Sequence, residues 1–285
     1  MINWPIPQGL SLQSCSFIFG EYFLEIIKRI FASRWLLHAM VSREIKSRYS
    51  GSILGIFWLF FAPVLMILTY SLVFADLMKS RLPGVSSHYA YTIYLTSGML
   101  VWQYFSEVVN RGKLFLVENA GLLRKNNISK IIPLISVVTI ALVNSLILAG
   151  FYFIFLILLN LFSLQILAVY LLQILVITLF AFSIAGLLAL AHAYVRDVGQ
   201  FVDAFMQILF WATPIVYAPQ ILPDWAARYI YLNPVYWISQ LGQQIVLDWP
   251  VAWNWLLNAF LLSIALFLIF YSLYSKNIQR IMDDL

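Results

Sequence analysis

Charged residues and cysteines are scarce in this chain of 285 residues. Only 10% of the residues are Asp, Glu, Lys or Arg, whereas soluble domains carry about 25%. Hydrophobic residues make up 63% and the mean hydropathy is +0.89, so the chain cannot cover itself with a water-soluble surface. The single cysteine, Cys15, excludes an internal disulfide and a cysteine-based metal cluster. These shortages predict an all-α integral membrane protein whose fold depends on the bilayer.

Motifs for catalysis and for nucleotide binding are missing as well. Gly112-Lys113 lacks the upstream glycine and the following hydroxyl residue of a phosphate-binding loop, so we do not expect this chain to hydrolyse ATP alone. The histidines, His38, His88 and His192, are scattered and none stands beside a carboxylate cluster, which argues against a metal site. A membrane glycosyltransferase would need such clusters near the interface. The sequence therefore favours a protein that is not an enzyme and binds no cofactor of its own.

Two segments near the N-terminus have amphipathic patterns but are too charged to cross a membrane. Residues 17–31 place apolar side chains on one side of a helix and charged ones on the other, and residues 36–49 continue in similar style. Both segments predict helices at the membrane interface. The second helix has two open interpretations, namely settlement on acidic headgroups and docking of a partner. Residues 1–12 lack the basic start and apolar core of a signal peptide, so we expect no cleavage there.

Long uncharged stretches predict six membrane-spanning helices. A helix of ~20 residues crosses ~30 Å of hydrocarbon at ~1.5 Å per residue. The longest uncharged stretch, residues 131–195, exceeds the length of one span, and its polar break at residues 160–165 divides it into two. The predicted spans are residues 52–75, 89–106, the two halves of 131–195, 199–218 and 253–275. Residues 52–275 would thus form one six-span membrane domain.

Residues 219–250 are apolar but make a poor membrane span. They contain an Asn233-Pro234 break and several glutamines within an otherwise weakly charged stretch. Irregular backbone at membrane depth is tolerated only where protein buries it or where it lines a cavity. We therefore expect a re-entrant element of short helices that dips into the outer leaflet between the fifth and sixth spans. A seventh span is the alternative, and it would place the two termini on opposite sides.

The distribution of lysine and arginine predicts the orientation of the chain. With six spans and the N-terminus inside, only Lys79, Arg81 and Arg228 of the 17 basic residues would face outward. Basic residues concentrate in cytoplasmic loops, so we expect both termini in the cytoplasm, with residues 1–51 and 276–285 as cytoplasmic segments. The net charge of +5 is thereby explained by membrane orientation. No basic and aromatic patch on a soluble fold favours nucleic-acid binding.

Aromatic residues are abundant, with 16 Tyr, 22 Phe and 10 Trp. Trp and Tyr commonly form belts at the headgroup level. Others, such as Tyr70 and Trp211, fall nearer to or within the predicted spans, and among these we select four, namely Phe57, Trp58, Phe61 and Tyr104. Sugar rings stack on flat aromatic faces, so these four residues are candidates to line a glycan path. Contact with lipid or with the protein core is the competing explanation, and the sequence alone does not separate the two.

Glu107 and Asp203 are the carboxylates nearest to the interiors of the predicted spans. Each lies within about a turn of the predicted inner interface, whereas proton relays place acids deeper. Ion-coupled transport is therefore not favoured. We expect both acids to pair with a basic residue nearby, Arg111 or Arg196.

A series of short motifs runs in a set order along residues 36–275. The motifs are residues 43–49 (REIKSRY), 51–55 (GSILG), 58–63 (WLFFAP), 97–102 (SGMLVW), 105–111 (FSEVVNR), 119–125 (NAGLLRK), 194–198 (YVRDV), 213–217 (TPIVY) and 232–234 (LNP). In this order they resemble the type 2 ABC exporter permeases, and most closely the group that exports O-antigen, capsule and teichoic acid. Residues 127–130 (NISK) depart from the family, which often has Phe-Pro followed by charged residues there.

This resemblance implies a half-transporter of a bacterial inner membrane. Two copies would form a homodimer that works with two separate ABC ATPase subunits, and these subunits would bind the ATP and Mg²⁺. Residues 36–49 would be the family's interface helix, and residues 122–132 its coupling helix. The implied contacts with the ATPase are Arg43, Glu44, Lys46, Arg48, Leu122, Leu123, Arg124, Lys125 and Lys130.

The cargo implied by the resemblance is an undecaprenyl-linked polysaccharide, most closely O-antigen, which moves through an inner membrane whose lipids also contact the chain. Capsule and teichoic acid export are alternatives within the same group, and a drug or small-lipid exporter is an alternative within the superfamily. The aromatic enrichment and the Asn233-Pro234 segment favour a glycan. A membrane glycosyltransferase is the competing function from another class, and the missing acid and histidine clusters disfavour it.

Overall fold

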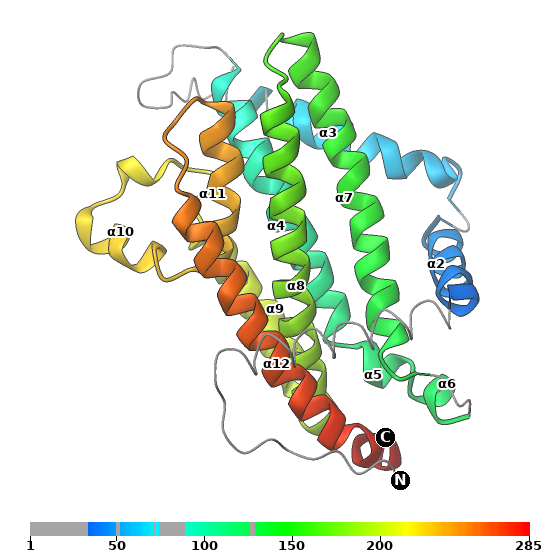
Figure 1. Cartoon of the computed structure of the whole chain (residues 1–285). Coiled ribbons are helices and arrows are strands. Elements are labelled where there is room, and N and C mark those ends of the chain that lie inside the picture. The colour runs from blue at the N-terminus through cyan, green and yellow to red at the C-terminus, as the bar shows by residue number, and fades with distance from the viewer. Residues whose placement is uncertain (1–33, 50–51, 71, 74–88, 126–128) are drawn as a thin grey trace.

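The computed structural model describes residues 34–49, 52–70, 72–73, 89–125 and 129–285, and every regular element within these ranges is helical (Figure 1). The prediction of an all-α protein is therefore confirmed. The predicted amphipathic helix at residues 17–31 lies outside the described residues, as do Lys79 and Arg81.

Four long helices form the body of the molecule, α4 (Ala90–Gly112), α7 (Ile132–Leu158), α8 (Leu164–Tyr194) and α12 (Trp253–Asp284). The central helix is α8, which packs against α4, α11 and α12 (Figure 1). Gly186 allows the close approach of α8 to α12, because a Cβ at this position would overlap the ring of Phe270. Among the described residues, α7, α8 and α12 are long and apolar enough to cross a membrane.

The turn between α7 and α8 follows the predicted polar break. Asn160 adopts the left-handed backbone conformation with φ 56°, which asparagine tolerates better than most residues. Ser163 then caps α8, because its hydroxyl oxygen accepts a hydrogen bond from the Ile166 N–H (3.3 Å). The prediction that residues 131–195 form two helices is confirmed.

The other three predicted spans correspond to α4 and to two shorter helices. The first of these, α3 (Trp58–Tyr70), begins after a 3-10 turn, η1 (Gly55–Phe57), and the second, α9 (Asp197–Trp211), ends before the predicted limit at residue 218. Pro214 explains the early end of α9, because proline has no N–H to donate within a helix. The 15 residues of α9 rise about 22 Å, which is less than the ~30 Å of a hydrocarbon core. The count of six spans therefore stays a prediction.

Residues 219–250 form short helices, as the sequence predicts. They are η3 (Pro219–Ile221), α10 (Asp224–Ile230) and α11 (Pro234–Val246). Asn233 caps α11 by accepting a hydrogen bond from the Val235 N–H (3.0 Å), and it donates another to Thr213 Oγ1 (2.7 Å) just beyond α9. The helix α11 packs against α4, α8 and α12. The depth of this element in a membrane stays a prediction.

The segments that connect the long helices divide between two ends of the bundle. One end, which we call the basal end, holds α5 (Phe115–Glu118), α6 (Ala120–Lys125), the start of α9 and the C-terminal end of α12 (Figure 1). The helix α2 (Arg34–Tyr49) packs against α7 toward the same end. The α7–α8 turn lies at the opposite end. Several segments predicted to be cytoplasmic thus share the basal end.

Candidate functional site

An open groove of about 830 Å³ separates α4 from α9. Its lining residues recur every three or four positions on both helices, so each helix contributes one face. The lining consists of Met99, Trp102, Gln103, Ser106, Glu107, Asn110, Asp203, Met206, Gln207, Phe210 and Trp211. We call this hollow the α4–α9 groove. It combines aromatic rings with amides, a hydroxyl and two carboxylates.

The aromatic rings and amides of the α4–α9 groove suit a ligand that has both apolar faces and hydroxyl groups. The ring centroid of Phe210 lies 5.3 Å from that of Trp102 and 5.4 Å from that of Trp211. Trp102 is buried, whereas Trp211 is 65% exposed and leaves its indole available. Gln207, one turn away on α9, is also exposed. A sugar ring can place its C–H face on an indole while its hydroxyls bond to amide groups.

A buried lysine connects α4 to α9 at the basal end of the groove. Lys113 Nζ donates hydrogen bonds to a carboxylate oxygen of Asp203 and to the carbonyl oxygen of Gly199 (3.0 Å). The Lys113 side chain is 2% exposed and that of Asp203 is 61% exposed. A buried ammonium group requires such partners, because its removal from water is costly. The prediction that Asp203 pairs with Arg111 or Arg196 is wrong, because its partner is Lys113.

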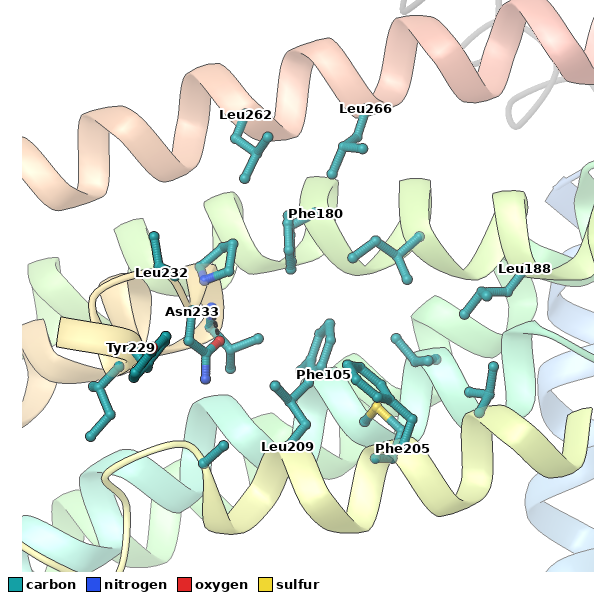
Figure 2. Close-up of a pocket in the computed structure, with 18 of the residues that line it drawn as sticks. Phe105, Phe180, Leu188, Phe205, Leu209, Tyr229, Leu232, Asn233, Leu262 and Leu266 are labelled. Carbon is teal, nitrogen blue, oxygen red and sulfur yellow. Dashed lines mark hydrogen bonds between the residues drawn. The ribbon is translucent and has the colours of Figure 1, made fainter. Parts of the chain in front are cut away.

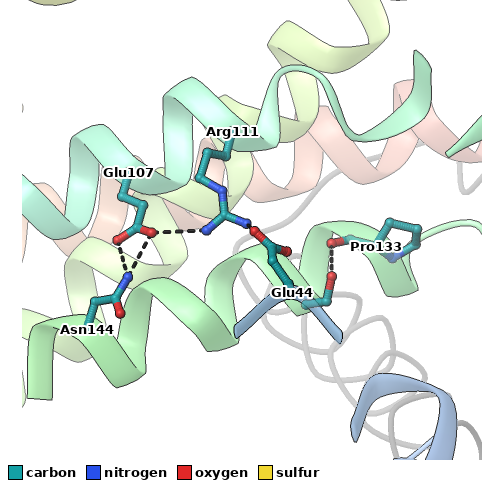
Figure 3. A network of polar contacts seen from close by, with 6 residues as sticks. Glu44, Glu107, Arg111, Pro133 and Asn144 are labelled. Atoms are coloured by element: carbon teal, nitrogen blue, oxygen red, sulfur yellow. Dashed lines mark hydrogen bonds and ion pairs between the residues drawn. The ribbon is translucent and has the colours of Figure 1, made fainter. Parts of the chain in front are cut away.

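A second ion-pair network joins α2, α4 and α7 (Figure 3). Arg111 Nη1 donates to Glu107 Oε1 (3.0 Å), and Arg111 Nη2 donates to Glu44 Oε1. Asn144 Nδ2 lies 2.9 Å from each carboxylate oxygen of Glu107. The side chains of Arg111, Glu44 and Glu107 are 24%, 33% and 21% exposed, so the network is partly withdrawn from water. The expected pair of Glu107 and Arg111 is confirmed.

The helix α6, which lies in the predicted coupling segment, contacts the last turn of α12. Arg124 Nε donates to the Met282 carbonyl oxygen (3.0 Å), and Arg124 Nη2 lies 3.4 Å from the Asp283 carbonyl oxygen. Carbonyl groups in the last turn of a helix lack intrahelical partners, so a cation there satisfies them. Lys130 Nζ donates to the Leu123 carbonyl oxygen and holds the two ends of this segment together.

The residues predicted to contact an ATPase differ in the exposure of their side chains and in the bonds that they already make. Arg43 and Lys46 on α2 are exposed. Leu122 on α6 is half-buried, whereas Leu123 is 0% exposed and belongs to the core. Glu44 is engaged with Arg111, as described above. The side chains of Arg48 and Lys125 lie outside the described part of the chain.

The aromatic residues predicted to line a glycan path separate into two groups. Phe57 and Trp58 are exposed, and their rings lie 5.3 Å and 5.7 Å from that of Phe61. Tyr104 is 1% exposed, and its hydroxyl bonds to Thr178 Oγ1 (2.8 Å) between α4 and α8. Tyr104 therefore packs in the core and does not line the α4–α9 groove.

The groove residues on α9 were not among the four residues selected from the sequence for a glycan path, although Asp203 was expected to form an ion pair. Asp203, Gln207 and Trp211 recur at four-residue spacing and are all exposed. Asp203 and Gln207 are the polar members of this face, and helical periodicity could have revealed it. On the other wall, Gln103 Nε2 of α4 donates to Met66 Sδ (2.7 Å) of α3, the helix that carries Phe61.

A second hollow, of about 780 Å³, lies on the other side of α9. Figure 2 shows Phe205 and Leu209 of α9 across from Leu262 and Leu266 of α12, with Phe180 of α8 between them. None of its lining residues is charged. Asn233 lies at one end, but its amide is already bonded to Thr213 and to the Val235 N–H. We call this hollow the apolar groove, and its chemistry suits a hydrocarbon chain.

No group of three or more His, Cys, Asp or Glu residues in the described ranges is placed to hold a metal ion.

The chain is similar to known transport proteins. A family model described as ABC-2 type transporter matches residues 36–247. An O-antigen export system permease protein RfbA of Myxococcus xanthus is 26% identical over 214 residues, which cover 74% of this chain and 80% of the relative. Two proteins of the same name from Klebsiella pneumoniae are 25% and 22% identical, and they cover 70% and 88% of this chain. These matches cover 75% and 95% of the two Klebsiella proteins.

Proposed function

The chain belongs to the ABC-2 type transporter family, and from this membership we propose that it is the permease subunit of an ATP-driven exporter of lipid-linked polysaccharide. The first candidate for the cargo is O-antigen, carried on an undecaprenyl lipid across a bacterial inner membrane. The observation that carries this proposal is the similarity to three O-antigen export permeases along at least 70% of the chain. The family and the apolar helices make the chain a multi-pass membrane protein and a transporter subunit.

We place the glycan path along the α4–α9 groove. Trp211 and Gln207 supply an exposed ring and an exposed amide there, which is the chemistry that a sugar needs. Phe57, Trp58 and Phe61 extend the proposed path on the side of α3. In a homodimer the grooves of two copies would face a shared passage. Tyr104 is not part of this path, because it is buried against α8.

Membership of the family implies pairing with an ABC ATPase subunit. In our proposal two such subunits bind ATP and Mg²⁺ and contact the basal end of the permease dimer. Exposed Arg43 and Lys46 on α2 support a docking role for that helix. Arg124 is bonded to α12 and Lys130 is bonded to the Leu123 carbonyl oxygen, so both residues support the position of α6. Leu122 and Lys125 stay our candidates for contact with the ATPase.

The proposed topology has six spans, both termini in the cytoplasm and a re-entrant element at residues 219–250. The common location of α5, α6 and the end of α12 at the basal end supports it, because the positive-inside rule assigns these segments to one side. The short helices α10 and α11 support the re-entrant element.

A small-lipid exporter is the second candidate function, and the apolar groove is the observation that favours it. Its uncharged lining and volume of about 780 Å³ would accept a lipid tail without any glycan. Capsule and teichoic acid remain alternative polysaccharides, because the groove does not distinguish one sugar from another.

Deletion of the gene in its own host tests the proposal. The deletion should remove the surface polysaccharide and cause lipid-linked polymer to accumulate inside the cell, and a plasmid copy of the gene should reverse both effects. Deletion of the partner ATPase gene should give the same result. Normal surface polysaccharide together with an altered composition of outer lipids would favour the small-lipid exporter instead.

A further inference from the structure

The guanidinium group of Arg111 joins three helices at the basal end. It bonds to Glu44 of α2 and to Glu107 of its own helix, α4, and Glu107 in turn accepts hydrogen bonds from Asn144 of α7 (Figure 3). The arrangement places two carboxylates around one cation. The contact between Arg111 and Glu44 is a side-chain ion pair between helices that lie far apart in the sequence.

An arginine is required for this geometry. Its planar guanidinium presents several N–H groups at fixed angles, so it can bond to two carboxylates at once, whereas a lysine offers a single point charge. The three side chains are only 21% to 33% exposed, so water screens their interaction less than on an open surface. Without Arg111, the two carboxylates would lose the cation between them and α2 would lose this ion pair to α4.

The same end of α4 is also attached to the wall of the α4–α9 groove. Glu107 lines that groove, as does Asp203 of α9. Lys113, two positions after Arg111, bonds to Asp203 and to the Gly199 carbonyl oxygen. The basal turns of α4 thus contact α2 through Arg111 and α9 through Lys113. A displacement of α2 would therefore move α4 and α9, the two walls of the α4–α9 groove, at its basal mouth.

We propose that Arg111 is a positioning residue that transmits the position of α2 to the basal mouth of the α4–α9 groove through Glu107. When α2 is docked, Arg111 is shared between Glu44 and Glu107. When α2 moves away, the bond to Glu44 breaks and Arg111 is held by Glu107 alone. The movement of α2 is caused by the ATPase subunit bound there, and this one step rests on the proposed function.

Distances between spin labels on α2 and α9 test this role directly. In a Cys15→Ser background, Ala39→Cys and Ala204→Cys would carry the labels, since both positions are exposed and neither lines a groove. The permease with its ATPase partner is placed in lipid nanodiscs and measured with and without ATP. We expect ATP to shift the distance in the otherwise unchanged protein and to leave it unshifted in Arg111→Lys.

Export per copy of membrane protein is the second readout. Coupling between sites commonly has a five- to 150-fold effect, and we expect Arg111→Lys to lower export at the small end of this range, about five- to tenfold, while ATP hydrolysis continues. Glu44→Gln, which keeps the shape of the side chain, should abolish the distance shift as well, and the double variant should be no worse than Arg111→Lys. Asp284→Asn, a change to an exposed carboxylate at the same end, is the matched control and should behave as the unchanged protein.

The two readouts separate failure of this inference from failure of the proposed function. An ATP-dependent shift that persists in both Arg111→Lys and Glu44→Gln would overturn the role of Arg111. If Arg111→Lys does not accumulate in the membrane, Glu44→Gln still tests the ion pair, because it removes the charge of the other partner. If the variants lose the ATP-dependent distance shift but the unchanged protein exports no glycan, the role of Arg111 is supported and only the proposed cargo is refuted.

Discussion

Two aromatic residues, Tyr104 and Trp211, illustrate how the side of a helix determines what a ring can do. Tyr104 faces α8, and its hydroxyl is bonded to Thr178 within the bundle. Trp211 faces the α4–α9 groove and is 65% exposed. Both rings belong to helices of predicted spans, and composition alone does not distinguish them. A role in moving sugars requires a free face, which only Trp211 has.

Trp211→Ala should therefore lower polysaccharide export without lowering the amount of protein in the membrane. A stacking contact worth ~0.7–1.4 kcal/mol would correspond to a loss of roughly three- to tenfold in rate. Trp211→Phe should keep most of the activity, because a flat ring remains. The measurement is surface glycan divided by the number of permease copies. Trp253→Ala is the control, since Trp253 is 51% exposed on α12 and lines neither groove. Equal export by the Trp211→Ala and Trp253→Ala variants would remove Trp211 from the path.

Tyr104 should respond in the opposite way. Tyr104→Ala leaves a cavity between α4 and α8, and truncations of large buried aromatics cost about 3–5 kcal/mol. We expect the protein to unfold at a lower temperature in detergent and to be less abundant. Tyr104→Phe loses only the bond to Thr178, at a cost of about 1 kcal/mol, and should export normally per copy. Reduced export per copy by the Phe variant would show that the hydroxyl contributes to transport.

At the scale of elements, the contact between α8 and α12 depends on a glycine. Gly186 faces the ring of Phe270, and that ring occupies the space where a Cβ would stand. Phe270 is fully buried and also contacts Phe182, with ring centroids 5.6 Å apart in an edge-to-face arrangement. The two helices are among those apolar enough to cross a membrane, so their packing determines much of the core. Small residues permit such close helix contacts where no hydrophobic effect favours them.

Gly186→Ala should destabilise the protein by about 1–3 kcal/mol, because Phe270 must leave its place. Gly150→Ala on α7 is the matched control, since nothing lies within 4 Å of a Cβ built there. Alanine has a higher helix propensity than glycine, so the control should be neutral or slightly stabilising. Thermal unfolding of the two purified variants in the same detergent measures the difference. A Gly186→Ala protein as stable as the Gly150→Ala protein would mean that α8 and α12 pack less closely than described here.

Local signals in the sequence predicted the breaks between elements well. The turn at Asn160 and the break at Asn233-Pro234 depend on the backbone preferences of single residues, and both are where the sequence places them. The predicted span at residues 199–218 was expected to be interrupted near its outer end by Pro214 and Pro219, and α9 ends at Trp211, before the first of these prolines. Apolar side chains continue past Trp211, but Pro214 stops the hydrogen bonding before it, and hydrophobicity alone does not record that effect.

At the scale of the whole molecule, the ion pairs show the limit of prediction from sequence. The pair of Glu107 and Arg111 spans one helical turn and was predictable from its spacing. The pair of Glu44 and Arg111 joins residues that stand 67 positions apart, so no local spacing predicts it. Lys113 and Asp203 meet only because α9 returns to the basal end of α4. Contacts of this kind require the arrangement of helices, which no local pattern contains.

The arrangement of the bundle also makes a prediction about topology. Lys276 lies on the C-terminal part of α12 and Arg196 lies just before α9, so both belong to the basal end. Arg228 belongs to α10, which follows the C-terminal end of α9 in the chain. The positive-inside rule assigns the end that is rich in basic residues to the cytoplasm, so Lys276 and Arg196 should be inside and Arg228 outside.

Reporter fusions after each of these three residues measure the orientation. A cytoplasmic reporter should be active after Arg196 and Lys276, and a periplasmic reporter after Arg228. The pair of Arg196 and Lys276 is decisive because α9, the short helix of about 22 Å, and α12 both lie between them. If α9 does not cross the membrane, a chain with α12 as the only crossing after Arg196 would place the two reporters on opposite sides. Agreement of both reporters in the cytoplasm, with Arg228 external, requires α9 to cross and supports the six-span topology. An external signal after Lys276 would contradict that topology. Together with an external Arg228 it would favour an additional crossing within residues 219–250, and together with a cytoplasmic Arg228 it would mean that α9 does not cross.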